Sequence, residues 1–233
     1  MRSERRAVLE HLADAVAAVR RSHPVRVAVD GIDAAGKSTL ADDLAGLVAA
    51  RGFPVIRASI DGFHRPRLER YRLGRESPEG YYRDSFDLEA LRRVLLDPLG
   101  PGGDRRYRTA VFDEASDLPV ESPEHHADPD AVLLFDGVFL LRPELEDCWD
   151  LVVFVECSPE TALLRAIERD APRSGTPEAL LGRYRSRYLP GQDLYLGECR
   201  PRERADFLVI NDDPDHPVVA GPSIEGGSGG YPN

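Results

Sequence analysis

The chain contains a single lysine, and that lysine lies in a glycine-rich segment that could bind phosphate. Lys37 follows Gly36 and precedes Ser38, and together with Gly31 these residues match the pattern G-x-x-x-x-G-K-[ST] at every fixed position. All other lysine-or-arginine positions are arginine. Arginine is a planar fork that fits poorly inside a loop wrapped around a phosphate, whereas lysine is a compact point charge. The segment therefore predicts a phosphate-binding loop.

The residues on both sides of this segment support the same prediction. A β-branched run at 25–29 indicates a strand, and the apolar spacing after Lys37 indicates a helix, so the glycines connect a strand to a helix. Backbone N–H groups at a helix N-terminus face an anion, Lys37 would reach the β- and γ-phosphates, and the Ser38 hydroxyl would ligate Mg²⁺. A chance glycine turn is the alternative. We expect Asp33, an acid inside an anion site, to point outward, and the nucleotide to be bound by Gly31, Ala34, Ala35, Gly36, Lys37, Ser38 and Thr39.

Two carboxylates follow predicted strands. Asp61 comes at the end of the run 54–60, and Asp136 follows the run 131–135. In an open α/β sheet, ligands bind beyond the carboxyl ends of the strands, so both carboxylates should lie beside the phosphates. Asp61 could accept a proton from an acceptor hydroxyl or help to hold Mg²⁺, and Asp136 is suited to holding Mg²⁺ with Ser38. For each residue the alternative is an ordinary Asp-Gly turn.

A pair of arginines precedes a turn that contains proline and glycine. Arg165 and Arg169 are four residues apart and would share one helix face. We expect the segment 165–175 to form a lid whose arginines stabilise a transferring phosphoryl group. The alternative is a solvated helix in which these arginines pair with Glu168 and Asp170.

Short apolar runs alternate with helical patterns along the chain. This alternation predicts an α/β fold of three layers with a five-stranded parallel sheet. Residues 1–24 should form an N-terminal helix, 25–211 the domain, and 62–113 an insertion that carries the acceptor site. The tail, 212–233, is rich in proline and glycine and is expected to be disordered. The predicted strands are 25–29, 54–60, 131–135, 150–155 and 206–210, and the predicted helices are 4–21, 38–50, 87–96, 159–169 and 177–188.

Composition excludes several classes of protein. A net charge of −11 and a pI of about 5.1 argue against nucleic-acid binding. No run is long enough to span a membrane, and the arginine-rich start continues into acidic residues, unlike a signal peptide. The three widely spaced cysteines suggest neither a disulfide framework nor a zinc site and suit a reducing cytoplasm. The apolar side of the first helix could be core or a contact in a homo-oligomer, and core packing is favoured.

Together these residues resemble the uridine kinase branch of the phosphoribulokinase/uridine kinase family, over about 25–211. The resemblance implies a P-loop kinase fold, ATP as the donor, Mg²⁺, and a catalytic group made of Asp61 as the base with Lys37, Arg165 and Arg169. It also implies acceptor-binding roles for His64, Tyr81, Asp84, Tyr107, Arg169 and Gln192. The segments that carry it, besides the phosphate loop, are Asp61-Gly62-Phe63-His64, Ser85-Phe86-Asp87, Arg106-Tyr107-Arg108-Thr109-Ala110, Phe135-Asp136-Gly137, Arg165 with Arg169 and Asp170, Leu189-Pro190-Gly191-Gln192-Asp193 and Ala205-Asp206-Phe207-Leu208-Val209-Ile210.

Two departures from the family pattern fall in the acceptor site. The family's F-D-H-P becomes Gly80-Tyr81-Tyr82-Arg83, so the Asp expected to hold the ribose hydroxyls is missing, and Asp84, three residues on, is a candidate substitute. The His of the family's Y-D-F-x-x-H segment is also absent.

The sequence thus predicts a cytoplasmic, ATP-dependent kinase for a primary hydroxyl of a small molecule. A pyrimidine ribonucleoside, converted to its 5′-monophosphate, is the leading acceptor. The alternatives are a kinase for another riboside, pantothenate or a sugar, and a non-catalytic, ATP-binding regulatory module.

Overall fold

The core of the computed structural model, which describes residues 3–174 and 176–220, is one sheet of six strands in the order β10-β9-β8-β1-β7-β2. The five predicted strands are present and parallel, and a sixth, antiparallel strand pairs with β9. The strands are β1 (Val25–Gly31), β2 (Val55–Ser59), β7 (Val132–Asp136), β8 (Leu151–Glu156), β9 (Phe207–Ile210) and β10 (Val218–Ala220).

The strand β10 lies in the tail for which the sequence predicted disorder. Its backbone pairs Val218 with Ile210 and Ala220 with Leu208 at the edge of the sheet. The prediction of disorder is therefore wrong for 212–220, because backbone hydrogen bonds to an open sheet edge order a segment that has few apolar side chains. The rest of the predicted tail, 221–233, lies outside the described residues.

Helices cover both faces of the sheet. The principal helices are α1 (Ser3–Ala18), α2 (Lys37–Ala50), α4 (Pro78–Asp84), α6 (Pro159–Ser174), α7 (Pro177–Arg183) and α8 (Leu189–Cys199). Shorter turns are the 3₁₀ turn η1 (Ile60–Phe63), α3 (Arg67–Arg70), α5 (Leu88–Leu91), the π-helical turns η2 (Arg92–Leu96) and η3 (Tyr184–Tyr188), and α9 (Pro201–Arg204). Two small hairpins complete the fold: β3 (Arg106–Tyr107) with β6 (His125–His126), and β4 (Phe112–Asp113) with β5 (Leu118–Pro119).

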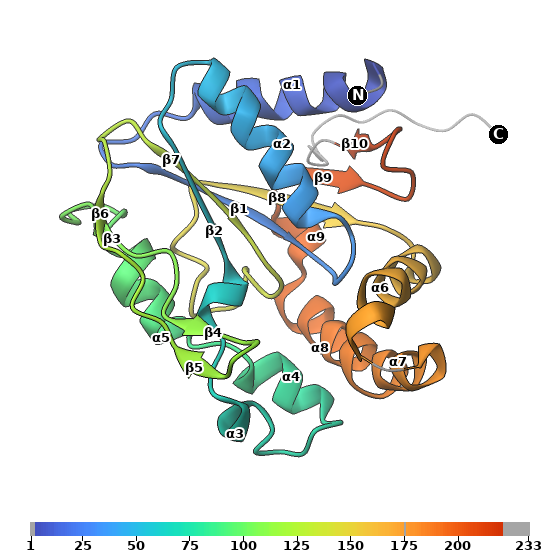
Figure 1. Ribbon diagram of the computed structural model, residues 1–233. Coiled ribbons are helices and arrows are strands. Elements are labelled where there is room, and N and C mark those ends of the chain that lie inside the picture. Colours follow the sequence, from blue (N-terminus) through green and yellow to red (C-terminus); the bar gives the residue numbers. More distant parts are fainter. Residues whose placement is uncertain (1–2, 175, 221–233) are drawn as a thin grey trace.

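Two apolar cores, one on each face of the sheet, give the three layers that the sequence predicts (Figure 1). On one face α1 and α2 pack together, and Leu9 and Leu12 of α1 are fully buried beside Leu44 of α2. The apolar side of α1 is therefore core of this single chain. On the other face the large buried rings include Phe135 and Tyr195.

The carboxyl ends of β1, β2 and β7 meet at one edge of the sheet, where the functional residues were expected. The phosphate loop follows β1, η1 follows β2, and Gly137 follows β7. The insertion, with α3 and α4, lies on one side of this edge, and α6 and α7 lie on the other (Figure 1). Side chains from both sides can therefore meet at this edge.

Candidate active site

The backbone of the phosphate loop has a shape that only glycine allows at two positions. Gly36, at the N-terminus of α2, has φ 96°, and a Cβ there would lie 2.5 Å from Nδ2 of Asn211. A Cβ on Gly31 would lie 2.1 Å from the carbonyl oxygen of Val155, since β1 and β8 approach closely at this point. Asn211 also donates from Nδ2 to the carbonyl of Ala35 at 2.7 Å. The end of β9 thus supports the loop.

Lys37 fills the loop that it follows. Its side chain is almost buried, and Nζ donates a hydrogen bond to the carbonyl of Ile32 at 2.6 Å. Burial lowers the pKa of Lys37, although the carboxylates of Asp33, Asp30 and Asp136 act against that shift. Nζ is therefore held inside the loop, where it can meet the phosphates of a nucleotide.

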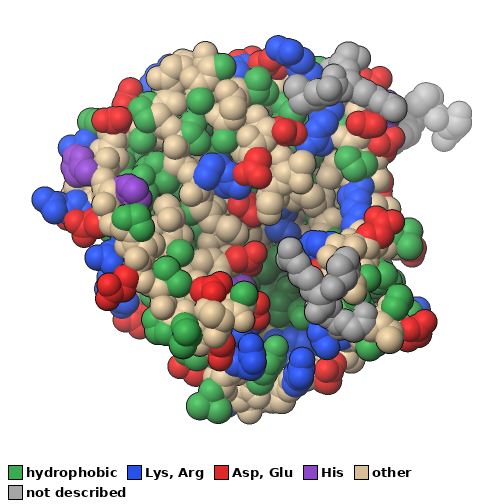
Figure 2. Space-filling view, viewed as in Figure 1, with side chains coloured by type: hydrophobic (Ala, Val, Ile, Leu, Met, Phe, Trp, Pro, Cys, Tyr) green, Lys and Arg blue, Asp and Glu red, His purple; other side chains and the backbone are tan. Residues whose placement is uncertain are grey.

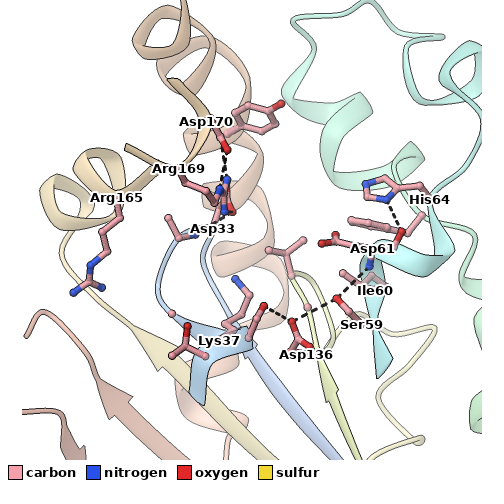
Figure 3. A pocket seen from close by; sticks show the side chains of 18 of the residues that line it. Asp33, Lys37, Ser59, Ile60, Asp61, His64, Asp136, Arg165, Arg169 and Asp170 are labelled. Carbon is pink, nitrogen blue, oxygen red and sulfur yellow. Dashed lines mark hydrogen bonds and ion pairs between the residues drawn. The ribbon is translucent and has the colours of Figure 1, made fainter. Parts of the chain in front are cut away.

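Asp136 lies beside Lys37 (Figure 3), and its carboxylate and the Ser38 hydroxyl supply converging oxygen atoms. The Ser38 hydroxyl donates to Oδ2 of Asp136 at 2.6 Å, and Arg57 of β2 donates to Oδ1 at 2.8 Å. Mg²⁺ prefers oxygen ligands, binds few protein groups and keeps waters and phosphate oxygens around it. A hydroxyl and a carboxylate in contact therefore fit a Mg²⁺ ion that also binds a nucleotide. Within 3–174 and 176–220 no group of three His, Cys, Asp or Glu residues forms an all-protein metal site.

Asp61 faces this group from the opposite wall (Figure 3). Its side chain opens into a recessed cavity, and this enclosure raises the pKa of Asp61, while His64 lowers it and Asp136 raises it further. The Asp61 carbonyl lies 3.0 Å from Nδ1 of His64, whose ring packs on Phe86 with centroids 4.6 Å apart. A carboxylate with a raised pKa is a better proton acceptor than an ordinary aspartate.

The expectation that Asp33 points outward is wrong. Its carboxylate lies in the cavity, where it accepts hydrogen bonds from the Tyr184 hydroxyl at 2.6 Å and from Arg169 at 3.2 and 3.3 Å. Burial raises the pKa of Asp33, but the charges of Arg169 and Lys37 outweigh burial, so the pKa lies below its usual value. A carboxylate inside an anion site is tolerated here because cations surround it.

These residues line one cavity of about 470 Å³ between the insertion and α6–α7. Figure 2 shows the hollow, with apolar side chains inside it and charged side chains at its rim. Beyond the phosphate loop the walls are largely aromatic: Tyr81 lies edge-on to Tyr188, with centroids 4.9 Å apart, and Phe86 and Tyr184 also line the cavity. The cavity therefore has a charged end at the phosphate loop and a flat-walled end that could hold a ring.

The structure brings most of the predicted site residues to this cavity. Gly31 and Ala35 shape the loop without lining the cavity, and Gln192 is buried, its Oε1 accepting from the backbone N–H of Asp33 at 3.1 Å. Arg165 reaches the rim, but its guanidinium donates to the carbonyls of Asn211 and Asp212 at 2.9 and 2.8 Å. The predicted residues in the lining are Ala34, Gly36, Lys37, Ser38, Thr39, Asp61, His64, Tyr81, Asp136, Arg165 and Arg169.

Besides the buried Gln192, two predicted acceptor residues do not line the cavity. Asp84 pairs with Arg72 at 3.3 Å, and Tyr107 packs against His125, with ring centroids 5.5 Å apart. Neither lines the cavity. Asp84 is the last residue of α4, three residues after Tyr81, and its ion pair with Arg72 holds it away from the cavity, while Tyr107 is held in the small β3–β6 hairpin.

The structure adds residues that sequence reasoning missed. Tyr184 and Tyr188 line the aromatic end, and both belong to the π-helical turn η3, a feature that often marks functional sites. The helical pattern at 177–188 predicted the helix but gave no reason to select these rings. Asn211 and Arg57 act on the loop and on Asp136 across large separations in sequence. The charge of Arg57 among the apolar residues Val55, Ile56 and Ala58 of β2 is the one local signal that could have identified it.

The cysteines and the helices of the described chain bear on two further kinds of function, thiol chemistry and membrane insertion. Cys148, Cys157 and Cys199 are buried and unpaired. In the described segments, 3–174 and 176–220, we find no helix with the length and apolar character needed to cross a membrane.

A glycine loop that holds a lysine at the end of a parallel strand, with a serine–aspartate pair beside it, defines a P-loop phosphotransferase. The chain is 30% identical over 189 residues to uridine-cytidine kinase B of Dictyostelium discoideum, which covers 80% of this chain and 74% of the relative. It therefore belongs to the uridine kinase branch of the phosphoribulokinase/uridine kinase family and is a phosphotransferase with an alcohol acceptor.

Solved structures share the fold of this chain. A possible uridine kinase from Bacillus stearothermophilus has the same fold, with a TM-score of 0.69 and 22% identity, over 87% of this chain and 97% of that one. A putative fructose transport system kinase from Silicibacter sp. TM1040 matches with a TM-score of 0.66 and 25% identity, over 81% of this chain and 94% of that one. No family model matches the chain.

Proposed function

We propose that the protein transfers the γ-phosphoryl group of ATP to the 5′-hydroxyl of a pyrimidine ribonucleoside, uridine or cytidine, to give the 5′-monophosphate and ADP. The observation that carries this proposal is that Asp61 faces the same cavity as Lys37, Ser38 and Asp136. A proton acceptor thus lies opposite a complete set of phosphate- and metal-binding groups. The name of the Dictyostelium relative, a uridine-cytidine kinase, supports the choice of acceptor.

The residues of the cavity divide between donor and acceptor. Lys37 and the loop N–H groups bind the β- and γ-phosphates, and Ser38 with Asp136 would hold Mg²⁺, which neutralises charge on those phosphates. The oxygen of the acceptor hydroxyl forms a bond to the γ-phosphorus, and the bond from that phosphorus to ADP breaks. Asp61 takes the proton that the hydroxyl loses. Arg169, at the rim, is the cation available to stabilise the charge on the transferring group.

The aromatic end of the cavity supports an acceptor with a planar ring. Tyr81, Phe86 and Tyr188 offer ring faces and edges opposite the phosphate loop, and such walls bind flat heterocycles by stacking. Burial raises the pKa of Tyr81, so its hydroxyl stays protonated and could donate a hydrogen bond.

A second acceptor class, a sugar or another small polyhydroxyl compound, is favoured by a specific observation. The position where the family has a ribose-binding Asp is occupied by tyrosine, and the candidate substitute, Asp84, is held by Arg72 away from the cavity. The similarity to a putative fructose transport system kinase is consistent with this alternative. Pantothenate and other ribosides are further alternative acceptors. Only the residues of the insertion, 62–113, would distinguish a kinase for one of these acceptors from a kinase for another.

The test is ADP release from ATP and Mg²⁺ over a panel of uridine, cytidine, purine ribosides, pantothenate and simple sugars, with the Lys37→Ala variant as the blank for contaminating kinases. Stimulation by uridine or cytidine is the expected result. Stimulation by another compound alone would keep the kinase mechanism and replace the acceptor. ATP binding without stimulation by any hydroxyl compound would overturn the proposal in favour of a regulatory module.

A further inference from the structure

The guanidinium of Arg169 is held by two carboxylates at the rim of the cavity (Figure 3). Its Nε and Nη2 donate to Asp170 at 2.8 and 3.0 Å, and its Nη1 and Nη2 donate to Asp33 at 3.2 and 3.3 Å. Both edges of the planar fork are thus occupied. In this arrangement Arg169 cannot also form a bidentate contact with a phosphoryl group, because the same donors would be needed.

Asp33 has no acceptor capacity left for another ligand. Besides Arg169, its Oδ1 accepts from the backbone N–H of Ala34 at 3.0 Å and its Oδ2 accepts from the hydroxyl of Tyr184 at 2.6 Å. A carboxylate offers about four lone-pair directions, and these contacts use all of them. This geometry argues against Asp33 as a ligand for acceptor hydroxyls and makes Arg169 its functional partner.

The place of Asp33 in the loop makes this contact sensitive to a nucleotide. Asp33 and Lys37 line the same cavity, and the charge of Lys37 helps to lower the pKa of Asp33, so a γ-phosphate bound by Lys37 would approach the Asp33 carboxylate. Two anions would then compete for one guanidinium, and the phosphate offers more charge and a matching pair of oxygens. The contact between Asp33 and Arg169 is then the one that must weaken.

We propose that Asp33 is a positioning residue that holds Arg169 beside the phosphate loop in the nucleotide-free enzyme and releases it to the γ-phosphate when ATP binds. The inference rests on the proposed function only in taking ATP as the ligand, and it is independent of the acceptor. It couples occupation of the donor site to delivery of the rim arginine. Tyr184 keeps the Asp33 carboxylate in place during the exchange.

A double-mutant cycle on nucleotide affinity tests this exchange. The dissociation constant of a non-hydrolysable ATP analogue with Mg²⁺ is measured for wild type, Asp33→Asn, Arg169→Gln and the double variant. The cycle reports how the interaction between Asp33 and Arg169 differs between the free and bound enzymes. The pair is present in the free enzyme and lost in the complex, so nucleotide binding in wild type must break it. The wild-type dissociation constant should therefore be about three- to tenfold higher than the value calculated from the three variants on the assumption that the two mutational effects add.

A matched cycle supplies the control. Arg51 and Glu10 also form an arginine–carboxylate pair, 2.7 Å apart, but they join α1 to α2 away from the cavity. Arg51→Gln and Glu10→Gln should combine additively for nucleotide affinity, within about twofold. Asp33→Ser replaces Asp33→Asn if the amide variant does not fold, as judged by its circular dichroism.

Each result has a distinct meaning. Additive effects at Asp33 and Arg169 would show that the pair survives nucleotide binding and would overturn the inference, while the proposed function would stand. Non-additivity of the opposite sign would show that ATP tightens the pair, which also overturns the inference. A wild-type protein that binds no nucleotide would overturn the proposed function and the inference together.

Discussion

Lys37 can be modified selectively at its amine, because the chain has no other lysine. Its pKa is lowered by burial, so more of the neutral amine is present at a given pH, and its side chain reaches the cavity. We expect an amine-directed acylating reagent to modify Lys37 and the N-terminal amine alone. MgATP at about ten times its Kd should slow modification of Lys37 about tenfold, because only the free enzyme reacts.

The measurement is the time course of modification of the Lys37 peptide by mass spectrometry. The N-terminal amine in the same sample is the internal control, and MgATP should leave its rate unchanged. Equal rates at Lys37 with and without MgATP would contradict a phosphate-binding role for this lysine.

Asp61 is predicted to act in the chemical step and not in ATP binding. Asp61→Asn keeps the shape of the side chain but removes the proton acceptor, so kcat should fall by about 10²- to 10⁴-fold. Because the pKa of Asp61 is raised, wild-type kcat/KM for the acceptor should rise with pH at values above those of an ordinary carboxyl group, as Asp61 loses its proton. The variant should lose this rising limb while its Kd for MgATP stays within about threefold of wild type.

Steady-state kinetics over a pH series and an ATP titration check this prediction. Asp130→Asn is the matched control, because Asp130 is exposed and precedes β7 at the opposite edge of the sheet from the cavity. A variant Asp61→Asn with wild-type kcat would remove Asp61 from the mechanism. Loss of ATP binding in the same variant would assign Asp61 to the donor site.

At the scale of single elements, β1 is joined to α8 through a buried carboxylate. Asp30 is fully buried, and it accepts hydrogen bonds from the Tyr195 hydroxyl and from the backbone N–H of Leu140 at 3.4 Å. Burial raises the pKa of Asp30 to about 6, although the hydrogen bond from Tyr195 acts in the other direction. The residue before the phosphate loop is thus a titratable group inside the core.

The raised pKa of Asp30 predicts how stability depends on pH. An ordinary aspartate has a pKa of 3.8, so between 3.8 and about 6 the folded protein binds more protons here than the unfolded chain. The free energy of unfolding contributed by Asp30 therefore falls as pH rises through this window and is constant above it. With 1.36 kcal/mol per pH unit, the two-unit window corresponds to about 3 kcal/mol at most.

Urea unfolding of wild type and Asp30→Asn from pH 4 to pH 7 isolates this contribution, because other groups cancel in the difference. Wild type should lose stability relative to the variant across the window. Tyr195→Phe removes a hydrogen bond that lowers the pKa and should extend the window to higher pH. A difference that does not change with pH would show that Asp30 titrates as an ordinary carboxyl group.

The elements themselves could be predicted from local sequence, because each depends on neighbours in the chain. The strand 131–135 is a continuous apolar run, and the loop around Lys37 is a motif of eight residues, so both were placed correctly. The strand β10 could not be predicted in this way, because backbone pairing with β9 defines it and its own side chains do not. Asp33 was misjudged for a related reason: its partner Tyr184 is 151 residues away.

At the scale of the whole molecule, the helices that stabilise one face of the sheet lie apart from the cavity at the ends of its strands. The cavity lies at the carboxyl ends of the strands, while α1 packs on α2 at one face (Figure 1). The acceptor end of the cavity combines the insertion with the turn η3, two segments far apart in sequence. Sequence patterns could therefore predict the residues of the proposed donor site, which are local to one loop and two strand ends, but not the aromatic walls of the proposed acceptor site, which depend on tertiary packing.

This separation makes a testable prediction for α1. Leu12 is fully buried against α2 and the sheet, so Leu12→Ala should lower the free energy of unfolding by about 2–5 kcal/mol. The KM for ATP, measured well below the melting temperature, should not change, because no residue of α1 lines the cavity. Leu68→Ala is the control, since Leu68 is 88% exposed and should change stability by less than about 0.5 kcal/mol.

The same variant distinguishes a core helix from a subunit contact. If α1 packs within one chain, as its buried leucines indicate, the urea midpoint of each protein should not depend on protein concentration. The wild-type midpoint should be equal at two concentrations tenfold apart, and so should the lower midpoint of Leu12→Ala. If α1 instead stabilised a dimer, the wild-type midpoint would rise with concentration, because association favours the folded state by mass action, and Leu12→Ala would remove this dependence. A concentration-dependent wild-type midpoint that Leu12→Ala abolishes would therefore contradict the intramolecular role of α1 and assign its apolar side to an interface.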